Sequence, residues 1–527
     1  MNGRWELVSK ATEFVAEEMG VALRRSALSP NIRERMDHSC AILTAAGEIV
    51  AQAEHIPVHL GSFKVGAENL LRALARDSVS IGPGDMVVVN DPYVSGTHLN
   101  DVMLLAPVVS KGSTIAYVVT KAHLVDVGGP APGSLNPGAR TLYDEGLVIP
   151  PTKLVRGGEL VPAVIELMAA NFKDPETAIG DVHAEIAANR MGIERVTRLL
   201  ERFGRASLEQ GWQDGIDHTR RVVRRCWSDW KAGSYRSEDC LELEGSFLPI
   251  RLRLVLSGRE ILADFSGTHA QVDAPLNAVF GVTYSATAFA IRSALGSAVA
   301  TNGGFYGCVS VRAPSGCLVN PVRPAAVSGG NVETTQRIAD VVFLALGKAI
   351  PERIPAASAG TMMNVMMGGK RASGAYWAYY ETVGGGTGAR PRGDGVSAVQ
   401  TNMTNTLNTP IEVAEREFPL VFTQYAIRPR SGGRGRYTGG SGIVRGFKVR
   451  RPTTLAVLAD RFLRGPWGRR GGGEGSPGRV RIVRGDREVL MPSKFMTELA
   501  PGDEVLLETP GGGGFGRRRR GGNRTAD

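Results

Sequence analysis

The sequence contains few cysteines and no long apolar segment. Five cysteines occur among 527 residues and none forms a CxxC pair, which argues against a disulfide framework and favours a reducing compartment. The longest apolar candidate, Tyr284 to Ala300, is interrupted by Arg292, so it falls short of the roughly 18 apolar residues that a membrane-spanning helix needs. The first residues, MNGRWELVSKATEF, lack the apolar core of a secretory signal. We therefore expect a cytoplasmic protein without membrane association.

A phosphate-binding loop of the type GxxxxGKS or GxxxxGKT is also absent, which argues against a self-contained P-loop ATPase. The net charge is +10, but five arginines and one aspartate between residues 517 and 527 supply +4 of it. Aromatic residues make up only 6% of the chain, and no RNA-binding or zinc-finger pattern occurs. This distribution indicates a solvated tail rather than a nucleic-acid-binding arm.

The residues that are present indicate an α+β protein with several domains. Helical spacing of apolar residues over 4–27 and 173–231 predicts helices. A period of two from about Tyr235 predicts an antiparallel sheet, and short strands between Gly-rich turns after about residue 430 predict a small β domain. The expected division is a mixed α/β N-terminal domain at 1–234, an α+β substrate or partner domain at 235–429, a β-rich domain at 430–516 and a disordered Arg-rich tail at 517–527.

Two hairpins are predicted within the N-terminal domain. The apolar runs 102–109 and 114–120 are separated by the four residues SKGS, a connection that suits an antiparallel hairpin. Earlier in the chain, 40–43 and 48–52 flank an Ala-Ala-Gly turn. Both hairpins carry histidine and aspartate just before their first strand, so we expect polar side chains to gather at the open ends.

The open end of the second hairpin is the predicted metal site. Counting outward from its turn places Asp101 opposite Ala122, so His98, Asp101 and His123 should converge there. Two imidazoles and one carboxylate are natural ligands for Zn²⁺, Mn²⁺ or Fe²⁺. A histidine at a strand end also commonly caps a turn or meets solvent, so the spacing alone leaves both interpretations open.

Further titratable residues follow the first hairpin. Glu54, His55 and His59 lie close together in sequence, but Pro57 argues against one helix that carries both histidines. We expect a loop here, with a helix beginning at Ser62 and ending at Arg76. Glu54 and His59 could act as general base or acid, or they could form hydrogen bonds that order the loop.

Two residues in the predicted middle domain are candidates for substrate binding. Asn331 is predicted to cap a helix that Gly329 and Gly330 precede, and the backbone amides at such an end attract anions. Residues 379–410 contain three consecutive glycines, many hydroxyl and amide side chains and Arg390, with little regular periodicity. This composition is typical of a binding loop, and Arg390 is its candidate contact.

Several ordered motifs together resemble the hydantoinase B/oxoprolinase family over about residues 5 to 516. The motifs are RERMDHSCAI, QAEHIPVHLGSF, NDPYVSGTHLNDV, AHLVDVGGPAPGS, GNVETTQRIAD, MTNTLNTPIE and PGGGGFG. The resemblance implies that His98, Asp101 and His123 bind a divalent metal, with Asp37 as a fourth ligand. It also implies that Glu54 lies near the metal, and Glu54 and His59 are then the candidates for catalytic proton transfer.

The same resemblance implies a function. The chain would be the HyuB-type subunit of an ATP-dependent cyclic amidase that opens hydantoin, 5-oxoproline or a lactam, in a hetero-oligomer whose HyuA-type partner uses the ATP. Where many members read HTHMTNT, this chain has Gln400 and Asn402 in place of the histidines, which weakens assignment to a particular ring. The alternatives are a subunit of a carboxylase like those for acetone and acetophenone, and a non-catalytic or nucleic-acid-binding protein that uses the Arg-rich tail.

Overall fold

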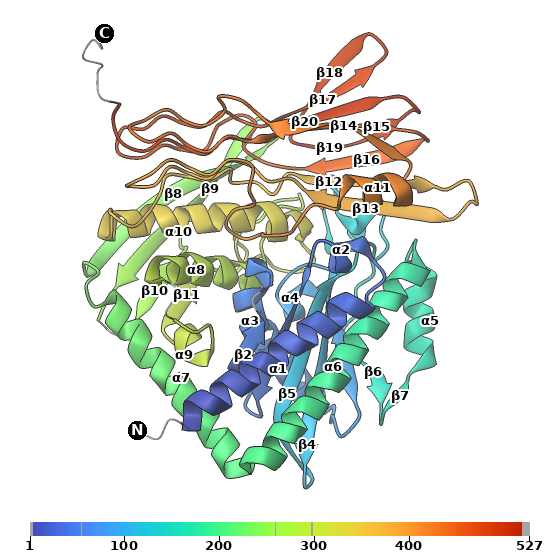
Figure 1. The fold of residues 1–527 in the computed structure, drawn as a ribbon, viewed down its shortest axis with the longest axis vertical. Helices are drawn as coiled ribbons and strands as arrows, with labels where there is room; N and C mark the ends of the chain where they lie inside the picture. The colour runs from blue at the N-terminus through green and yellow to red at the C-terminus, as the bar shows by residue number, and fades with distance from the viewer. Residues whose placement is uncertain (1–3, 54, 259, 297–298, 519–527) are drawn as a thin grey trace.

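The computed structural model describes residues 4–53, 55–258, 260–296 and 299–518. The helices that position the site pack around an N-terminal sheet and between it and the rest of the molecule (Figure 1). The α-helices are α1 (Arg4–Ser26), α2 (Pro30–Arg33), α3 (Pro57–Arg76), α4 (Pro92–Ser95), α5 (Pro162–Asn171), α6 (Pro175–Phe203), α7 (Arg205–Trp227), α8 (Phe280–Leu295), α9 (Gly303–Tyr306), α10 (Thr335–Ala349) and α11 (Ile411–Glu417). Short helical turns are η1 (Pro132–Ser134), η2 (Leu142–Asp144) and η3 (Gly330–Thr334).

The N-terminal sheet has the order β2-β1-β5-β4-β3-β6-β7, and every neighbouring pair is antiparallel. Helices α1 and α6 pack against this sheet, and α7 packs against α1. Because the central strands are buried along almost their whole length, they read as continuous apolar runs rather than alternating ones. The strands are β1 (His38–Thr44), β2 (Ile49–Ala53), β3 (Met86–Val89), β4 (Asp101–Ser110), β5 (Ser113–His123), β6 (Thr152–Arg156) and β7 (Glu159–Leu160).

Helices α3, α8 and α10 join this sheet to a second one. The hydroxyl of Ser285 on α8 donates to the carbonyl of Val58 at 2.7 Å and accepts from the amide of Gly61 at 3.1 Å, which ties α8 to the first turn of α3. Helix α10 packs on α8 and on the strands β8 and β9. The second sheet has the order β11-β10-β9-β8 and consists of β8 (Gly233–Leu243), β9 (Ser246–Leu256), β10 (Ile261–Asp264) and β11 (Val309–Arg312).

Two further sheets lie over α10 on the side away from the N-terminal helices (Figure 1). Their orders are β13-β12-β16-β19 and β14-β15-β20-β17-β18, so each sheet joins strands from both sides of residue 430, and the expected domain boundary falls within them. The strands are β12 (Asn364–Lys370), β13 (Tyr376–Thr382), β14 (Leu420–Ile427), β15 (Ile443–Val449), β16 (Thr453–Leu458), β17 (Arg479–Arg484), β18 (Arg487–Met491), β19 (Lys494–Leu499) and β20 (Glu504–Glu508).

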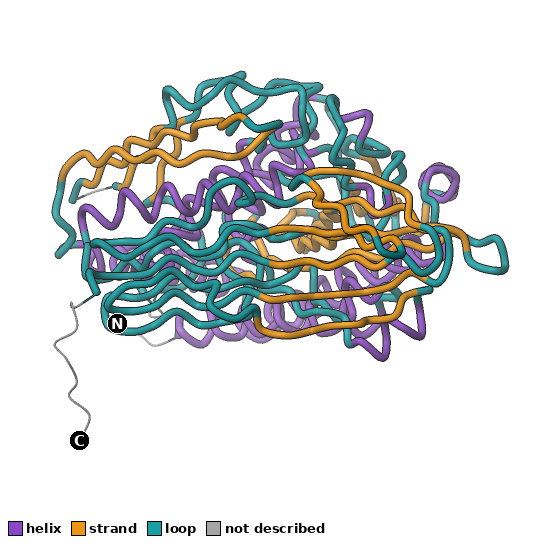
Figure 2. Tube along the Cα trace, turned by 90° about the horizontal axis from the view of Figure 1, so that it is seen from above, coloured by secondary structure: helices purple, strands orange, loops and turns teal. Residues whose placement is uncertain are grey.

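Most of the C-terminal glycines lie in extended segments that pack side by side, seen as parallel loops in Figure 2. Residues 384–396, 430–441, 465–478 and 509–516 exchange backbone hydrogen bonds, for example from the Gly433 amide to the Gly512 carbonyl at 2.8 Å. A Cβ placed on Gly512 would lie 1.9 Å from the carbonyl oxygen of Thr387, so only glycine permits this approach. The prediction of Gly-rich turns was therefore wrong here, because these glycines form a packed layer.

The predicted class, a multidomain α+β protein with antiparallel sheets, is confirmed. The helix predicted at 4–27 corresponds to α1, and the one predicted at 173–231 is two helices separated at Gly204. Helix α3 begins at Pro57 rather than Ser62, because proline fits the first turn, where its missing N–H has no helical partner. Among the described residues no helix is long and apolar enough to cross a bilayer.

Candidate metal centre

The predicted hairpin is formed by β4 and β5, and its open end gathers the expected side chains. Asp101 pairs with His123, one residue beyond the expected Ala122. The cause is a bulge: Val109 pairs with Thr114 and Val108 with Ala116, which leaves Ile115 as an extra residue in β5. The bulge brings His123 directly opposite Asp101, and His98 lies in the turn that leads into β4.

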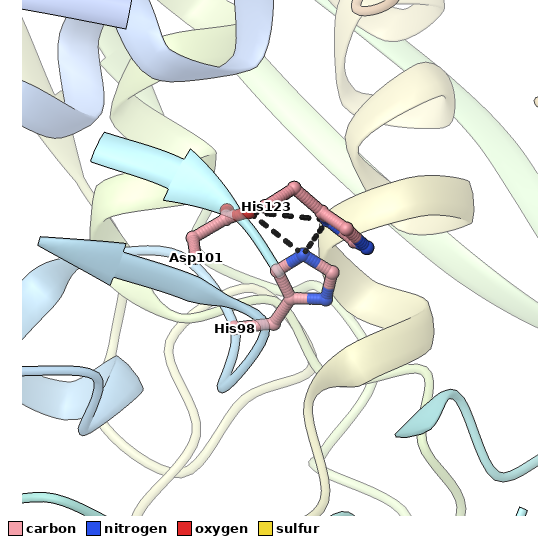
Figure 3. A group of neighbouring side chains, drawn as sticks. All are labelled: His98, Asp101 and His123. Atoms are coloured by element: carbon pink, nitrogen blue, oxygen red, sulfur yellow. Dashed lines mark hydrogen bonds and ion pairs between the residues drawn. The ribbon is translucent and has the colours of Figure 1, made fainter. Parts of the chain in front are cut away.

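The three side chains point toward one another (Figure 3). His98 Nε2 lies 3.1 Å from Asp101 Oδ1 and 3.1 Å from His123 Nδ1, and His123 Nδ1 lies 3.3 Å from Asp101 Oδ1. All three residues are buried, with exposures of 3% or less. Among the histidine, cysteine and carboxylate side chains of the described residues, this is the one group of three or more whose ligand atoms all lie within 4.8 Å of one another.

These distances fit a shared divalent cation. Nitrogen and oxygen ligands at about 2.1 Å from a zinc-sized ion, separated by about 90–109°, lie about 3.0–3.4 Å apart. His98 Nε2 and His123 Nδ1 are two ring nitrogens that face each other. Among the described ion pairs, those of the Asp101 carboxylate are with imidazoles. The set therefore has the donors and the spacing of a metal site.

Burial and charge favour the protonation states that a metal needs. Burial acts to raise the pKa of the Asp101 carboxyl, but the neighbouring imidazoles, His98 above all, outweigh it and hold that pKa well below its usual range. Burial lowers the pKa of His123, although Asp37 and Asp101 oppose the shift. Near neutral pH, Asp101 is therefore ionised and His123 is neutral, which are the states that coordinate a cation.

A third imidazole approaches the same carboxylate from α3. His59 Nε2 lies 3.5 Å from Asp101 Oδ2 and has no hydrogen bond, while His59 Nδ1 lies 3.1 Å from the hydroxyl of Ser39. Ser39 donates its own proton to the His38 carbonyl at 2.8 Å, so its oxygen accepts a proton from His59 Nδ1. His59 Nε2 therefore faces the Asp101 carboxylate at the edge of the cavity that both residues line.

The centre opens into a narrow cavity of about 20 Å³, enough for about one water molecule. The side chains around it come from regions far apart in the sequence, since β4, β5, α3, η3 and the loops after β13 and before β12 all contribute. The lining residues are Asp37, Ile56, Val58, His59, Asp101, His123, Asn331, Val332, Met362, Tyr380, Thr382, Met403 and Thr404. A ring-sized ligand can enter only when some of these side chains move.

The remaining candidates are placed differently. Asp37 lines the cavity but is not part of the set within 4.8 Å, so its role as fourth ligand stays a prediction. Asn331 also lines the cavity; the prediction that it caps a helix was wrong, because it lies within η3, ahead of α10. Arg390 is exposed in the glycine layer and does not line the cavity. Glu54 lies outside the described residues.

Other residues at the centre escaped the sequence interpretation. Arg35 is buried beside the cavity and lies over the ring of Tyr380, 4.5 Å from its centroid. Tyr380 in turn stacks on His123, with ring centroids 4.9 Å apart. Arg35 stands two residues before Asp37 in the motif RERMDHSCAI, so its proximity to Asp37 was the one signal available. Nothing in the sequence connected it with Tyr380.

Three residues without glycine's freedom adopt left-handed backbone conformations next to this cavity. Met36, Met363 and Asn402 have φ of 58°, 47° and 55°, and each immediately precedes or follows a lining residue. Such conformations cost about 1–3 kcal/mol each and collect at functional sites. Their position indicates that the surrounding structure holds the lining side chains in place.

The sequence matches the Hydantoinase B/oxoprolinase family over residues 3–518. An uncharacterized protein of Methanocaldococcus jannaschii is 44% identical over 97% of this chain and 90% of its own length. A Pseudomonas protein named as one subunit of a D-/L-hydantoinase is 29% identical over 97% of this chain and 89% of its own length. 5-oxoprolinase 1 of Arabidopsis thaliana is 32% identical over 95% of this chain, which spans only 41% of that longer protein.

Two solved structures share the fold. The ATP-dependent caprolactamase of Pseudomonas jessenii superposes with a TM-score of 0.90 and 27% identity, over 97% of this chain and 90% of that one. A nucleotide-free acetone carboxylase superposes with a TM-score of 0.89 over 98% of this chain and 76% of that one, but at 19% identity. The second likeness concerns the fold alone.

Proposed function

Because the chain belongs to the hydantoinase B/oxoprolinase family, we propose that it is the HyuB-type subunit of an ATP-dependent cyclic amidase. The substrate class is a hydantoin, 5-oxoproline or a lactam. The observation that carries the proposal is the convergence of His98, Asp101 and His123, with ligand atoms 3.1–3.3 Å apart, in a buried cavity of a chain that resembles an ATP-dependent caprolactamase.

A cyclic amide resists water because resonance between nitrogen and carbonyl makes the carbon a poor electrophile. The partner subunit would use ATP to phosphorylate the carbonyl oxygen, which removes that resonance. A divalent cation, when bound, would polarise an oxygen of the substrate and lower the pKa of a water. This subunit would then exclude bulk water, hold the activated carbon near its centre and manage the proton.

The position of each residue in or beside the cavity suggests which of these roles it has. His98, Asp101 and His123 are the proposed metal ligands, and Asp37 is the candidate for a further ligand from the same cavity. His59 is the proposed general base, because its Nε2 faces Asp101 in the cavity and its Nδ1 is fixed by Ser39. Asn331 is retained as a substrate contact since it lines the cavity with an unpartnered side-chain oxygen.

A partner subunit is required by this scheme. The chain contains no P-loop motif, and it spans about two fifths of the 5-oxoprolinase that it matches. The Pseudomonas relative is itself named as a subunit of a hydantoinase rather than as the whole enzyme. We propose that a HyuA-type ATPase is its partner in a hetero-oligomer.

The test is to purify the protein with its neighbouring gene product and measure ATP-dependent turnover of hydantoins, 5-oxoproline and caprolactam. We expect one ring to be opened, with turnover lost when the metal is removed by a chelator and restored by Mn²⁺, Zn²⁺ or Fe²⁺. The acetone carboxylase fold likeness motivates one additional assay, with acetone, ATP and bicarbonate. Carboxylation there, with no ring opened, would replace the proposal.

A further inference from the structure

Three threonine hydroxyls form a chain that ends at the cavity beside the metal centre. Thr382 Oγ1 lies 2.7 Å from Thr406 Oγ1, which lies 3.3 Å from Thr404 Oγ1. Thr382 and Thr404 line the cavity, and all three residues are buried, with exposures of 5% or less. A hydroxyl offers one proton and two lone pairs, so the neighbours of each oxygen determine which way its proton points.

The direction of the first link follows from two donors at Thr382. Its hydroxyl accepts from Arg35 Nη2 at 3.1 Å and from Gln400 Nε2 at 3.0 Å. The Gln400 amide is oriented, because the same nitrogen also donates to the Thr382 carbonyl at 3.1 Å. Both lone pairs of Thr382 are therefore occupied, and its proton must be donated to Thr406.

The same reasoning carries the direction to Thr404. Thr406 accepts from Thr382 and from Arg35 Nη2 at 3.3 Å, so its own proton is donated to Thr404. Within the part of the chain that the structure describes, Thr406 is the hydrogen-bond partner of the Thr404 hydroxyl. Having accepted one proton, Thr404 has its own proton available for an acceptor in the cavity.

Arg35 makes the Thr404 hydroxyl a stronger hydrogen-bond donor. It is 1% exposed, its other hydrogen bonds go to the Asn31 side chain and the Tyr380 carbonyl, and no described carboxylate lies within ion-pair distance of it. A buried guanidinium without a counter-ion stabilises negative charge nearby. Its hydrogen bonds to Thr382 and Thr406 polarise the three threonine hydroxyls toward the cavity, so the Thr404 hydroxyl would donate its strongest hydrogen bond to an anionic oxygen.

We propose that Thr404 is a catalytic residue that donates its hydroxyl proton in a hydrogen bond to a negatively charged oxygen of the ligand at the metal centre. That oxygen would be a carbonyl oxygen that gains charge during attack, or the phosphorylated form of that oxygen. This chemical class rests on the proposed function. The direction of the hydrogen bonds rests on Arg35, Gln400 and the threonines alone. Donors placed where charge develops act by selective stabilisation of the transition state.

Formate is a suitable probe, because it presents a small anionic oxygen and requires neither ATP nor a partner subunit. Calorimetric titration of formate into the full-length, manganese-loaded protein would be compared for wild type, Thr404→Val, Thr404→Ala and Thr404→Ser. We expect Val and Ala to weaken formate binding about tenfold, as expected for a lost hydrogen bond to a charged group, and Ser to stay within about twofold of wild type. Metal content, measured on the same samples, should be unchanged.

Thr409→Val is the matched control, since Thr409 is 2% exposed in the same loop and does not line the cavity; it should bind formate like wild type. Formate that binds Thr404→Val or Thr404→Ala as tightly as wild type would overturn the inference, and so would a wild-type protein that does not bind formate. Failure to open any cyclic amide would overturn the proposed function while leaving the formate result unaffected, so the two failures are distinguishable.

Discussion

Two of the clusters of buried charged side chains in the described part of the chain are satisfied in opposite ways. One is the metal centre on the N-terminal sheet. The other lies where α10 meets β8 and the C-terminal sheets, and it alternates acids with bases: Arg337 pairs with Asp460 at 2.8 Å, and Arg461 pairs with Asp239 at 2.8 Å and with Asp340 at 3.0 Å. Lys494 completes it with a contact of 3.1 Å to Asp460.

The difference lies in where the positive charge comes from. In the Arg337 cluster every aspartate is paired with an arginine or lysine of the chain, so the charges balance internally. At the candidate metal centre the ion-pair contacts of Asp101, among the described residues, are with imidazoles, and two ring nitrogens lie 3.1 Å apart. Buried charge is tolerated when it is paired or bound to metal, and the Arg337 cluster has its partners within the chain. At the candidate metal centre no lysine or arginine of the described residues is in ion-pair contact with Asp101, an arrangement that suits a bound cation.

The largest effect is expected when the carboxylate at the candidate metal centre is removed. Asp101→Ala should reduce bound metal, measured by plasma mass spectrometry, to near zero, and should lower ATP-dependent turnover at least about a thousandfold. The exposed Asp229→Ala on the loop after α7 serves as control and should retain both. Full metal content in Asp101→Ala would remove the basis for the comparison.

Removing a carboxylate from the other cluster should damage stability instead of metal binding. Asp460→Ala leaves the buried charge of Arg337 and the partly buried charge of Lys494 without their closest partner, and such a loss costs about 3–5 kcal/mol of unfolding free energy. The measurement is urea unfolding, and metal content should not change. Glu209→Ala, which breaks the exposed pair with Arg205 at 2.9 Å, should cost less than about 1 kcal/mol. Equal losses in the two variants would contradict the assignment.

The same contrast explains what the sequence could predict. The three proposed ligand residues lie within 26 positions, on or just before a single hairpin, so strand spacing and a turn were enough to bring them together, apart from the bulge at Ile115 that shifted the register by one. The Arg337 cluster joins residues between 239 and 494. Local periodicity contains no information on contacts over such separations.

The other residues that surround the cavity could not be predicted from the sequence for the same reason. Its threonine chain comes from β13 and the loop that follows, and Arg35 reaches it from the opposite end of the sequence. Asn331 was singled out for a helix cap that does not exist, yet it lines the cavity, so its role in substrate binding stays a prediction. Arg390 lies in a loop with the composition of a binding site that packs into the glycine layer, and its role also stays a prediction.

A finer test separates the metal ligands from the proposed base. His59→Gln should keep the metal and lower turnover about a hundredfold, the effect expected when a general base is lost. Ser39→Ala, which removes the acceptor of His59 Nδ1, should lower turnover about tenfold and leave metal content unchanged. Loss of metal in His59→Gln would make His59 a ligand, and the centre would then contain three imidazoles around Asp101.

The smallest expected effect concerns Glu333, which stands between the two clusters. Its Oε1 accepts from the amide of Met362, a cavity residue, and from Asn364 at 2.8 Å. Burial, with the nearby charge of Asp460 as a second cause, raises its pKa from 4.5 to about 8. Unlike Asp460, Glu333 has no cationic partner among the described ion pairs, so we expect it to be neutral at pH 7.

This neutrality has a definite signature in stability. Between pH 4.5 and about 8 the folded state holds a proton on Glu333 that the unfolded chain has released, so the unfolding free energy of the wild type falls as pH rises, by about 1.4 kcal/mol per unit. Gln cannot titrate. The stability of Glu333→Gln relative to wild type should therefore increase by about 2 kcal/mol between about pH 6 and 7.5, measured by urea unfolding with EDTA present. A difference in unfolding free energy between Glu333→Gln and wild type that does not change with pH would mean that Glu333 is ionised in the folded state. A cation near Glu333 would then be needed to balance its charge, as at the candidate metal centre.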